Sequence, residues 1–293
     1  MLYNDDEKIT YGEVYRWGKE QLAEAGILEA ALDARLLLEG RCGTDRNTLL
    51  VHGDRTLSAA EFESYRSDIA RRKEHIPLQH ITGQQEFMGL TFWVNENVLV
   101  PRQDTEVLVE EVMRHFSDGM HILDMCTGSG CILISLLHYS NNCSGVGVDR
   151  SEEALHVAKK NGTGILGERG EDGPVRWVRS DLFAELDSGE RFDVIVSNPP
   201  YIKTSVIDTL MPEVKDHEPR MALDGQEDGL FFYREITAQA GEYLTGGGML
   251  FFEIGYDQGE AVSGLMEEAG YREIEVVRDF AGLDRVVYGV WPG

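Results

Sequence analysis

The stretch Leu123-Asp124-Met125-Cys126-Thr127-Gly128-Ser129-Gly130 decides the fold. A short apolar run ends in it, and a segment rich in Ile and Leu follows at residues 131–137. This order predicts a buried strand, a glycine turn and then a helix. Gly128 and Gly130 leave room for a ligand beside the backbone, and the free N–H groups at the helix start face that ligand. Two glycines alone also fit a tight turn that binds nothing.

Acidic residues after the next two predicted strands favour a ligand site. Asp149 lies 19 residues after Gly130, where a carboxylate can accept both hydroxyls of a ribose or can cap a helix that opens at Ser151. Asp181 could accept a hydrogen bond from an adenine amino group, or serve as a cap or loop acid. A dinucleotide fingerprint asks for a third glycine where this chain has Leu133. A nucleoside without a pyrophosphate therefore fits better.

The chain after His121 predicts a parallel sheet covered on both faces, because short apolar runs alternate with helical segments. The predicted strands are Ile122–Met125, Gly145–Val148, Val175–Val178, Val194–Ser197, Met249–Glu253, Glu273–Val277 and Arg285–Val290. Gly162–Gly173 is expected to be a loop, and Gly246–Gly248 a turn before the fifth strand. Glu253, at the end of that strand, lies near the expected site edge or forms a buried pair.

The N-terminal part, from Thr10 to about Lys73, predicts helices. Two capping boxes, Thr10-x-x-Glu13 and Ser58-x-x-Glu61, mark helix starts. Two apolar stripes indicate a small helical core, formed by Ile27, Leu28, Leu32, Leu36 and Leu37 and by Phe62, Tyr65 and Ile69. A dense basic cluster indicates a solvated helix face or, alternatively, a partner contact; it comprises Arg66, Arg71, Arg72 and Lys73.

The segment after Pro77 breaks the helical pattern. Residues 79–100 alternate like a strand pair, and a helix over 104–116, capped by Asp104 or Thr105, is expected next. The predicted organisation is therefore a helical domain at 1–76, a β-hairpin linker at 77–103 and an α/β domain at 104–293.

Charge and composition narrow the classes of function. The 293 residues include 52 acidic and 27 basic side chains, for a net charge of -25. Residues 1–100 hold 17 acidic and 11 basic side chains, and residues 101–293 hold 35 and 16. This excess disfavours an extended grip on nucleic acid phosphates. Without a membrane-length apolar run, a leader or paired cysteines, the sequence predicts a cytoplasmic protein without disulfides. The scattered histidines predict no metal site.

The tetrapeptide Asn198-Pro199-Pro200-Tyr201 follows the fourth predicted strand. Successive prolines fix φ and donate no N–H, so a carbonyl of the turn can face the site beside the Asn198 side-chain oxygen. Two acceptors in this arrangement would hold both hydrogens of a planar NH2 group. Tyr201 could stack on the group that carries it. This pattern indicates methyl transfer to an amide or aromatic amine nitrogen, driven by positioning rather than by a strong base.

Together these motifs give the chain a family resemblance. The glycine loop, the acid after the second strand and the N-P-P-Y turn resemble an S-adenosylmethionine-dependent methyltransferase. More narrowly, the chain resembles the bacterial release-factor glutamine methyltransferases. Further matching segments are Pro77-Leu78-Gln79, Ile81-Thr82-Gly83, Glu86-Phe87-Met88-Gly89, Val100-Pro101-Arg102, Asp104-Thr105-Glu106, Glu218-Pro219-Arg220, Ala222-Leu223-Asp224-Gly225, Asp228-Gly229-Leu230 and Glu253-Ile254-Gly255-Tyr256.

The resemblance implies a fold, a reaction and a set of site residues. It implies a seven-stranded Rossmann-like methyltransferase domain behind a small helical domain that recognises the substrate. The implied substrate is the Gln of the Gly-Gly-Gln motif in class I peptide-chain release factors, with Asn198, Pro199, Pro200 and Tyr201 forming the amide pocket. The residues implied to bind S-adenosylmethionine are Asp124, Cys126, Thr127, Gly128, Ser129, Gly130, Asp149, Asp181, Leu182 and Asn198.

Two positions depart from the family pattern. Cys126 stands where the family usually has Gly, so the loop requires a backbone angle that Cys can adopt or a slightly shifted path. Leu182 stands at a position that is often aromatic in relatives. Cofactor affinity could therefore differ from that of the relatives.

Three alternative functions remain open. A ribosomal protein could supply the glutamine, since a similar turn would accept the same side chain. An adenine amine in DNA or RNA needs comparable acceptors, but such an enzyme normally carries a basic groove. A non-catalytic S-adenosylmethionine sensor is disfavoured, because it would have no use for an amide pocket.

Overall fold

The computed structural model describes residues 9–167, 173 and 175–293, and within them the chain divides into two compact units. Unit 1 comprises residues 1–83 and 212–217 as far as they are described, and unit 2 comprises residues 84–211 and 218–293. The helices of unit 1 are α1 (Tyr11–Glu24), α2 (Ala30–Cys42), α3 (Arg46–Val51), α4 (Ala59–Lys73), α5 (Leu78–Thr82) and α10 (Pro212–Lys215).

Both predicted capping boxes of unit 1 are confirmed. The Thr10 and Ser58 hydroxyls accept from the N–H groups of Glu13 and Glu61, at 3.3 and 3.2 Å, and both glutamates bond back to the cap residues. These bonds satisfy N–H groups that the helix itself leaves unpaired.

The predicted helical core of unit 1 is partly wrong. The stripe Phe62, Tyr65 and Ile69 is buried, but Leu28 and Leu32 are exposed. Ile27 and Leu37 of the predicted stripe are buried, and Ala34 and Leu38 lie beside Leu37 on the buried face of α2, so this face is rotated away from Leu32. The full core cluster of the unit is Tyr11, Val14, Leu22, Ile27, Ala30, Ala34, Leu37, Leu38, Cys42, Leu57, Phe62, Tyr65, Ile69 and Ile81.

The basic cluster on α4 is not a purely solvated face. Arg72 is buried, and its guanidinium pairs with Asp33 at 2.7 Å and with Glu213 at 3.0 Å. Buried charges require such partners, so this arginine ties helices of unit 1 together.

Unit 2 contains a β-hairpin and an α/β domain. The hairpin pairs β1 (Gln84–Phe87) with β2 (Leu90–Trp93). The strands of the large sheet are β3 (His121–Met125), β4 (Ser144–Asp149), β5 (Val175–Arg179), β6 (Phe192–Ser197), β7 (Leu244–Glu253), β8 (Arg272–Arg278) and β9 (Asp284–Val290). The helices are α6 (Gln103–Arg114), α7 (Cys131–His138), α8 (Glu152–Leu166), α9 (Thr204–Ile207), α11 (Arg220–Leu223), α12 (Phe231–Ala240) and α13 (Gly259–Glu268).

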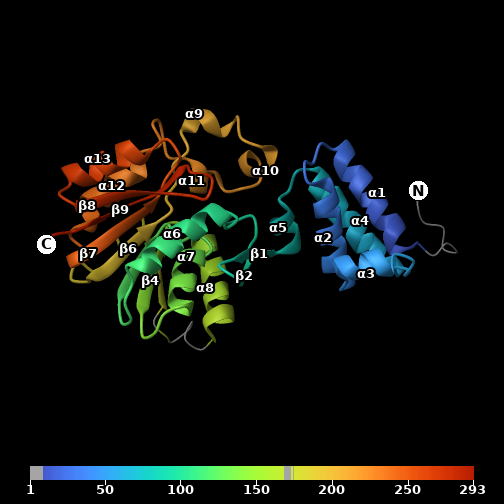
Figure 1. Ribbon diagram of the computed structural model, residues 1–293, viewed down its shortest axis with the longest axis horizontal. Coiled ribbons are helices and arrows are strands. Elements are labelled where there is room, and N and C mark those ends of the chain that lie inside the picture. Colours follow the sequence, from blue (N-terminus) through green and yellow to red (C-terminus); the bar gives the residue numbers. More distant parts are fainter. Residues whose placement is uncertain (1–8, 168–172, 174) are drawn as a thin grey trace. The chain divides into compact units, whose positions relative to one another are not determined.

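The seven strands of the sheet lie in the order β5-β4-β3-β6-β7-β9-β8, and β9 is antiparallel to both of its neighbours. Helices α6, α7 and α8 cover one face, and α12 and α13 cover the other (Figure 1). The predicted fold class is therefore confirmed. The order reverses at β3, which has β4 on one side and β6 on the other, so the carboxyl ends of these strands border the crevice where such sheets bind ligands.

All seven predicted strands are present, each one to five residues longer than expected. The largest difference is at Gly246–Gly248, which we expected to form a turn. These glycines instead lie inside β7, where the register against β6 shifts between Phe192 and Val194 and Gly247 has a φ of 87°. The pairing of β7 with β6 is therefore interrupted between Leu244 and Met249, and glycine is common at such an interruption within a strand.

Two helix boundaries also differ from the expectation. Helix α8 continues through Gly162 to Leu166, so the predicted loop over 162–173 begins too early, and residues 168–172 lie outside the described residues. Helix α6 begins at Gln103, and the predicted caps Asp104 and Thr105 lie in its first turn. Thr105 is buried there, where its hydroxyl serves the site described below.

Candidate active site

The glycine loop between β3 and α7 is held by backbone bonds to neighbouring strands. The N–H of Thr127 donates to the carbonyl of Val148 at 2.9 Å, and the N–H of Gly130 donates back to Thr127 at 2.8 Å. Cys126 has a φ of 63°, in the left-handed region that favours glycine. The loop therefore keeps the path that a glycine would take at this position, and it places the strain on Cys126.

Asp124 lies beneath this loop and is fully buried. Its Oδ2 accepts from the Thr127 hydroxyl at 2.5 Å and from the N–H of Leu133 at 3.3 Å. Burial raises the pKa of this carboxyl to about 7. Asp124 is not among the residues that line the cavity, so its visible role is to fix the loop against the start of α7.

Asp149, at the end of β4, faces the loop from the neighbouring strand. One carboxylate oxygen accepts from the N–H of Gly128 at 2.9 Å, and the other accepts from the N–H of Ser151 at 2.9 Å. Ser151 itself caps α8. Asp149 thus binds the helix entry and also lines the cavity, so its two alternative roles are compatible.

The end of β5 contributes the third edge of the site. Asp181 is largely exposed and lies 4.0 Å from the Arg150 guanidinium. Leu182 has a φ of 52°, and both residues line the cavity. The bend at Leu182 turns the chain so that this edge faces the ends of β4 and β3.

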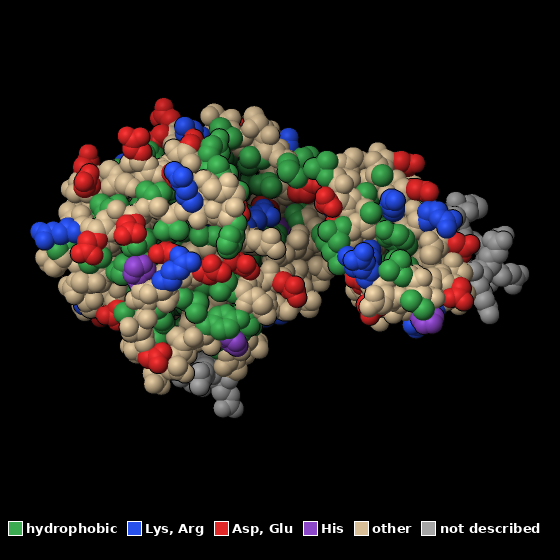
Figure 2. Space-filling view, in the orientation of Figure 1, with side chains coloured by type: hydrophobic (Ala, Val, Ile, Leu, Met, Phe, Trp, Pro, Cys, Tyr) green, Lys and Arg blue, Asp and Glu red, His purple; other side chains and the backbone are tan. Residues whose placement is uncertain are grey.

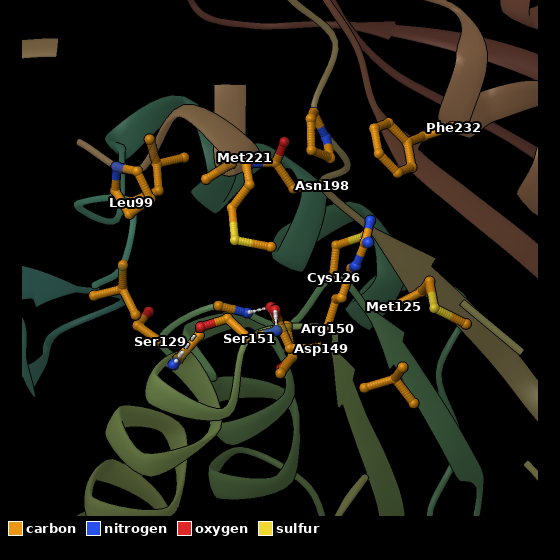
Figure 3. A pocket seen from close by; sticks show the side chains of 18 of the residues that line it. Leu99, Met125, Cys126, Ser129, Asp149, Arg150, Ser151, Asn198, Met221 and Phe232 are labelled. Carbon is orange, nitrogen blue, oxygen red and sulfur yellow. Dashed lines mark hydrogen bonds between the residues drawn. The ribbon is translucent and has the colours of Figure 1, made fainter. Parts of the chain in front are cut away.

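These edges surround a cavity of about 410 Å³ within unit 2. This volume falls in the range of small-molecule sites, roughly 300–1,000 Å³. Figure 3 shows Asn198 and Met221 on one side of the cavity and Ser129, Ser151 and Asp149 on the opposite side. The remaining wall comes from the segments 97–102 and 219–226.

The turn after β6 forms the second side of the cavity. Asn198 and Pro200 line it, whereas Pro199 and Tyr201 are not among the lining residues. The Asn198 Nδ2 donates to the Thr105 hydroxyl at 3.3 Å, and the Tyr201 hydroxyl donates to Glu253 Oε1 at 3.5 Å. Burial raises the pKa of Tyr201, so its hydroxyl stays protonated. Both ends of the turn are therefore fixed by buried side chains from other elements.

Two glycines let the chain pass directly beneath this turn. A Cβ on Gly225 would lie 2.7 Å from Tyr201 Cα and 2.9 Å from the Pro200 carbonyl oxygen. A Cβ on Gly229, which has a φ of 76°, would lie 2.5 Å from the Tyr201 carbonyl oxygen. That carbonyl also accepts from Gln258 Nε2 at 3.2 Å. The glycines of the A-L-D-G and D-G-L motifs are thus required by close approach to the turn.

Other motifs pair with one another around the cavity. The Arg102 guanidinium donates to both carboxylate oxygens of Glu218, at 2.8 and 2.7 Å, and the N–H of Val100 donates to the same group at 3.2 Å. Glu106 accepts from the N–H of Met88 at 2.7 Å. From the sequence alone these motifs are points of resemblance only, and their pairing was not predicted. The signal that could have predicted this pairing is the presence of oppositely charged residues, Arg and Glu, within these short motifs.

The described part of the chain has neither a metal-ligand cluster nor a helix of membrane-spanning character. Within residues 9–167, 173 and 175–293, no group of three His, Cys, Asp or Glu side chains is arranged to hold a metal ion. Over the same ranges, no helix has the length and apolar character needed to span a bilayer.

Comparisons with known proteins cover nearly the whole chain. Residues 13–83 match the family described as PrmC N-terminal domain, and residues 102–214 match the methyltransferase small domain family. The release factor glutamine methyltransferase of Caulobacter vibrioides is 41% identical over 285 residues, and that of Geobacter sulfurreducens is 42% identical over 280; each match covers 96% of both chains.

A solved structure agrees with the fold. The methyltransferase from Pyrococcus furiosus has a TM-score of 0.50 and 15% sequence identity, and the match covers 80% of this chain and all of that chain. At this identity the likeness shows the fold alone. The identity of about 40% to full-length relatives shows more: the chain belongs to the release factor glutamine methyltransferase family.

Proposed function

We propose that this chain methylates the side-chain amide nitrogen of the glutamine in the Gly-Gly-Gln motif of class I peptide-chain release factors, using S-adenosylmethionine. The observation that carries the proposal is the orientation of Asn198. Its Nδ2 is taken up by Thr105, which leaves Oδ1 as an acceptor at a cavity wall opposite the glycine loop. An acceptor at this position suits a substrate NH2 group.

The opposite wall fits the cofactor. Among the described residues, no atom lies within 4 Å of a Cβ built on Gly128, so the loop is open where a ligand would approach its backbone. Asp149 and Asp181 offer acceptors for hydroxyl and amino groups, and Leu182 offers an apolar surface. We therefore propose that Cys126 to Gly130, Asp149, Asp181, Leu182 and Asn198 hold S-adenosylmethionine, with Asp124 supporting the loop from below. When bound, the cofactor supplies an electrophilic methyl group.

The residues of the turn would prepare the amide nitrogen. Its lone pair is conjugated, so the nitrogen is a poor nucleophile in its resting form. Asn198 Oδ1 and a carbonyl of the Pro199–Pro200 turn would accept its two hydrogens, orient it and stabilise the positive charge that develops on it. Tyr201, fixed by Glu253, would pack on the planar amide. No strong base is required, because the proton can leave to water or to the acceptors after transfer.

We propose a role for each part of the chain. Residues 1–76 would recognise the release factor, residues 77–103 would form a hairpin linker, and residues 104–293 would carry the reaction. The match of residues 13–83 to the N-terminal domain family supports a separate N-terminal domain, which extends through α5 to about residue 83. Because release factors act in translation termination, the enzyme would work in the cytoplasm.

Charge favours a protein acceptor over a nucleic acid. On the face drawn in Figure 2, Lys and Arg side chains lie scattered among Asp and Glu. The net charge of -25 points the same way, since phosphate binding needs a basic surface. An adenine-amine methyltransferase is thus disfavoured. A ribosomal protein glutamine remains the alternative with the same chemistry.

The test uses the methyl label as its readout. The chain is incubated with labelled S-adenosylmethionine and a purified release factor, its Gln→Ala version, a ribosomal protein fraction or duplex DNA. We expect label in the release factor alone, and none in its Gln→Ala version. Label in DNA, preferential label in ribosomal protein, or undiminished label in the Gln→Ala factor would refute the assignment.

A further inference from the structure

A buried carboxylate lies beneath the N-P-P-Y turn without a complete set of partners. Glu253, at the end of β7, is 2% exposed, and its Oε1 accepts from the Tyr201 hydroxyl at 3.5 Å. Within the described residues, no group meets the distance and angles of a hydrogen bond to Oε2. An unpaired buried carboxylate oxygen is costly, so a donor for Oε2 is to be sought among its neighbours.

The hydroxyl of Thr105 is the neighbour that can supply this donor. It is buried in the first turn of α6, and its oxygen accepts from Asn198 Nδ2 at 3.3 Å. A hydroxyl has one hydrogen to donate, and the bond from Asn198 leaves that hydrogen free. Both groups are buried and both hold the same turn, Thr105 through Asn198 and Glu253 through Tyr201. In agreement with this placement, hydrogen bonding with Thr105 lowers the pKa of Glu253 against the larger effect of burial. A small movement of either side chain would complete the bond between the Thr105 hydroxyl and Glu253 Oε2.

We propose that Glu253 is a positioning residue that decides which end of the Asn198 amide faces the cavity. The ionised carboxylate only accepts, so it takes the Thr105 hydrogen. The Thr105 oxygen must then accept from Asn198 Nδ2, and Asn198 Oδ1 is presented to the substrate. Through Tyr201 the same carboxylate holds the other end of the turn. This inference deepens the proposed function and rests on it.

The surroundings of Glu253 favour the ionised form of its carboxylate only moderately. Arg285 attracts its negative charge, whereas Asp104 repels it, and burial raises the pKa to about 7. Tyr233 donates to its backbone carbonyl at 2.9 Å rather than to the side chain. A neutral side chain that carries a donor at this position could reverse the relay. Thr105 would then donate to Asn198 Oδ1, and the Asn198 NH2 group would face the substrate.

A reversed Asn198 amide predicts a shift of substrate preference from glutamine toward glutamate. General damage to the site would not produce this shift. An Asn198 NH2 group repels the NH2 of glutamine but can donate to a carboxylate. We therefore compare the binding of the release factor with that of its Gln→Glu version, at about pH 8, where carboxylates with a pKa near 7 are mostly ionised. The enzyme variants are Glu253→Gln, Thr105→Val and the control Thr105→Ser, which keeps the hydroxyl.

The expected results separate the relay from a general loss of structure. Glu253→Gln should lower kcat at least about tenfold. It should also shift the ratio of affinities toward the Gln→Glu factor by at least about tenfold, while the Kd for S-adenosylmethionine stays within about twofold. Thr105→Val should lower kcat similarly, and Thr105→Ser should retain most of it. Kinetics and calorimetry give all of these quantities.

Several outcomes would overturn the inference. One is an affinity ratio that Glu253→Gln leaves unchanged, and another is a wild-type kcat in Thr105→Val. If Glu253→Gln fails to fold by circular dichroism, the pair of Thr105 variants decides. If the wild-type chain leaves the release factor unlabelled, the proposed function itself fails, and this inference fails with it.

Discussion

The two sides of the cavity are built in different ways. The side formed by the glycine loop depends mainly on bonds that span 3, 9 and 21 residues along the chain, those of Asp124 to Thr127 and Leu133 and that of Asp149 to Gly128. The side formed by the N-P-P-Y turn depends on partners 93, 52 and 57 residues away, namely Thr105, Glu253 and Gln258. Each side rests on one fully buried carboxylate, Asp124 or Glu253, with a pKa raised to about 7. We therefore expect a single substitution on the loop side to leave most of the activity, whereas a single substitution on the turn side should remove most of it.

The largest effect is expected from Asn198→Ala. The variant removes the acceptor for the substrate amide, so kcat should fall by about 10²–10³, as for loss of one preorganised transition-state contact. The Kd for S-adenosylmethionine should rise by only about threefold, because Asn198 is one of several proposed cofactor contacts and the loop side remains intact. Asn141→Ala is the control, since Asn141 is exposed and bonds to Asp118 instead. Kinetics on the release factor decide: activity above about a tenth of wild type would remove Asn198 from the mechanism.

The backbone of the N-P-P-Y turn is expected to be sensitive to added volume at Gly225. In Gly225→Ala the new Cβ meets Tyr201 Cα and the Pro200 carbonyl, neither of which is a flexible side-chain end. We expect a loss of unfolding free energy of about 1–3 kcal/mol and a fall in kcat of at least about tenfold, with near-normal cofactor binding. Urea unfolding, kinetics and calorimetry measure the three quantities.

Gly264→Ala is the matched control for this substitution. Gly264 lies inside α13, and a Cβ there meets nothing within 4 Å. Alanine favours a helix interior over glycine, so this variant should be slightly more stable than wild type and fully active. A Gly225→Ala variant as active as the control would show that the turn is held by its side chains alone.

The loop side is tested by the pH dependence of stability. Burial raises the pKa of Asp124 from its ordinary value of 3.8 to about 7, so the folded state binds this proton more tightly than the unfolded state does. The resulting stabilisation is fully present below about pH 4 and is lost as the pH rises toward 7. Asp124→Asn should abolish this part of the pH dependence, on the order of 4 kcal/mol between pH 4 and 8.

Urea unfolding of wild type and Asp124→Asn at several pH values provides the measurement. The exposed residue Asp118 supplies the control Asp118→Asn, which should follow the wild-type curve. Glu253 contributes in the same direction in all three proteins, so only the difference between the curves is assigned to Asp124. Parallel curves for wild type and Asp124→Asn would contradict a raised pKa at this position.

The same contrast explains what could be predicted from the sequence. The strands, the glycine loop and Asp149 are encoded in contiguous patterns, so their positions along the chain followed from local sequence alone. The N-P-P-Y turn was also visible as a tetrapeptide. The supports of the turn could not be found in this way, because Thr105, Gly225 and Gln258 reach it only through the fold.

Errors in the prediction have a similar physical cause. The run Gly246–Gly248 has the local composition of a turn, yet it lies within β7, where the backbone of Gly247 and Gly248 bonds to that of Trp291. Leu28 and Leu32 have helical spacing with Leu36, but the packing of α1 and α4 against α2 buries Ala34 and Leu38 instead. In both places tertiary contacts outweigh the local pattern.

The smallest effect is expected at Cys126. Its φ of 63° is unfavourable for a side chain by roughly 1 kcal/mol, and glycine would relieve this strain. Glycine would also remove a partly buried thiol that packs against the core, so the net gain in unfolding free energy for Cys126→Gly should be at most about 1 kcal/mol. Cys126→Val is the informative partner variant, because a β-branched side chain is least compatible with this backbone and should lose about 1–2 kcal/mol. Urea unfolding compares the two, and kcat should remain near wild type for Cys126→Gly if the sides of the cavity act separately. Equal destabilisation of both variants would mean that the packing of the thiol, and not the backbone angle, explains the cysteine in this loop.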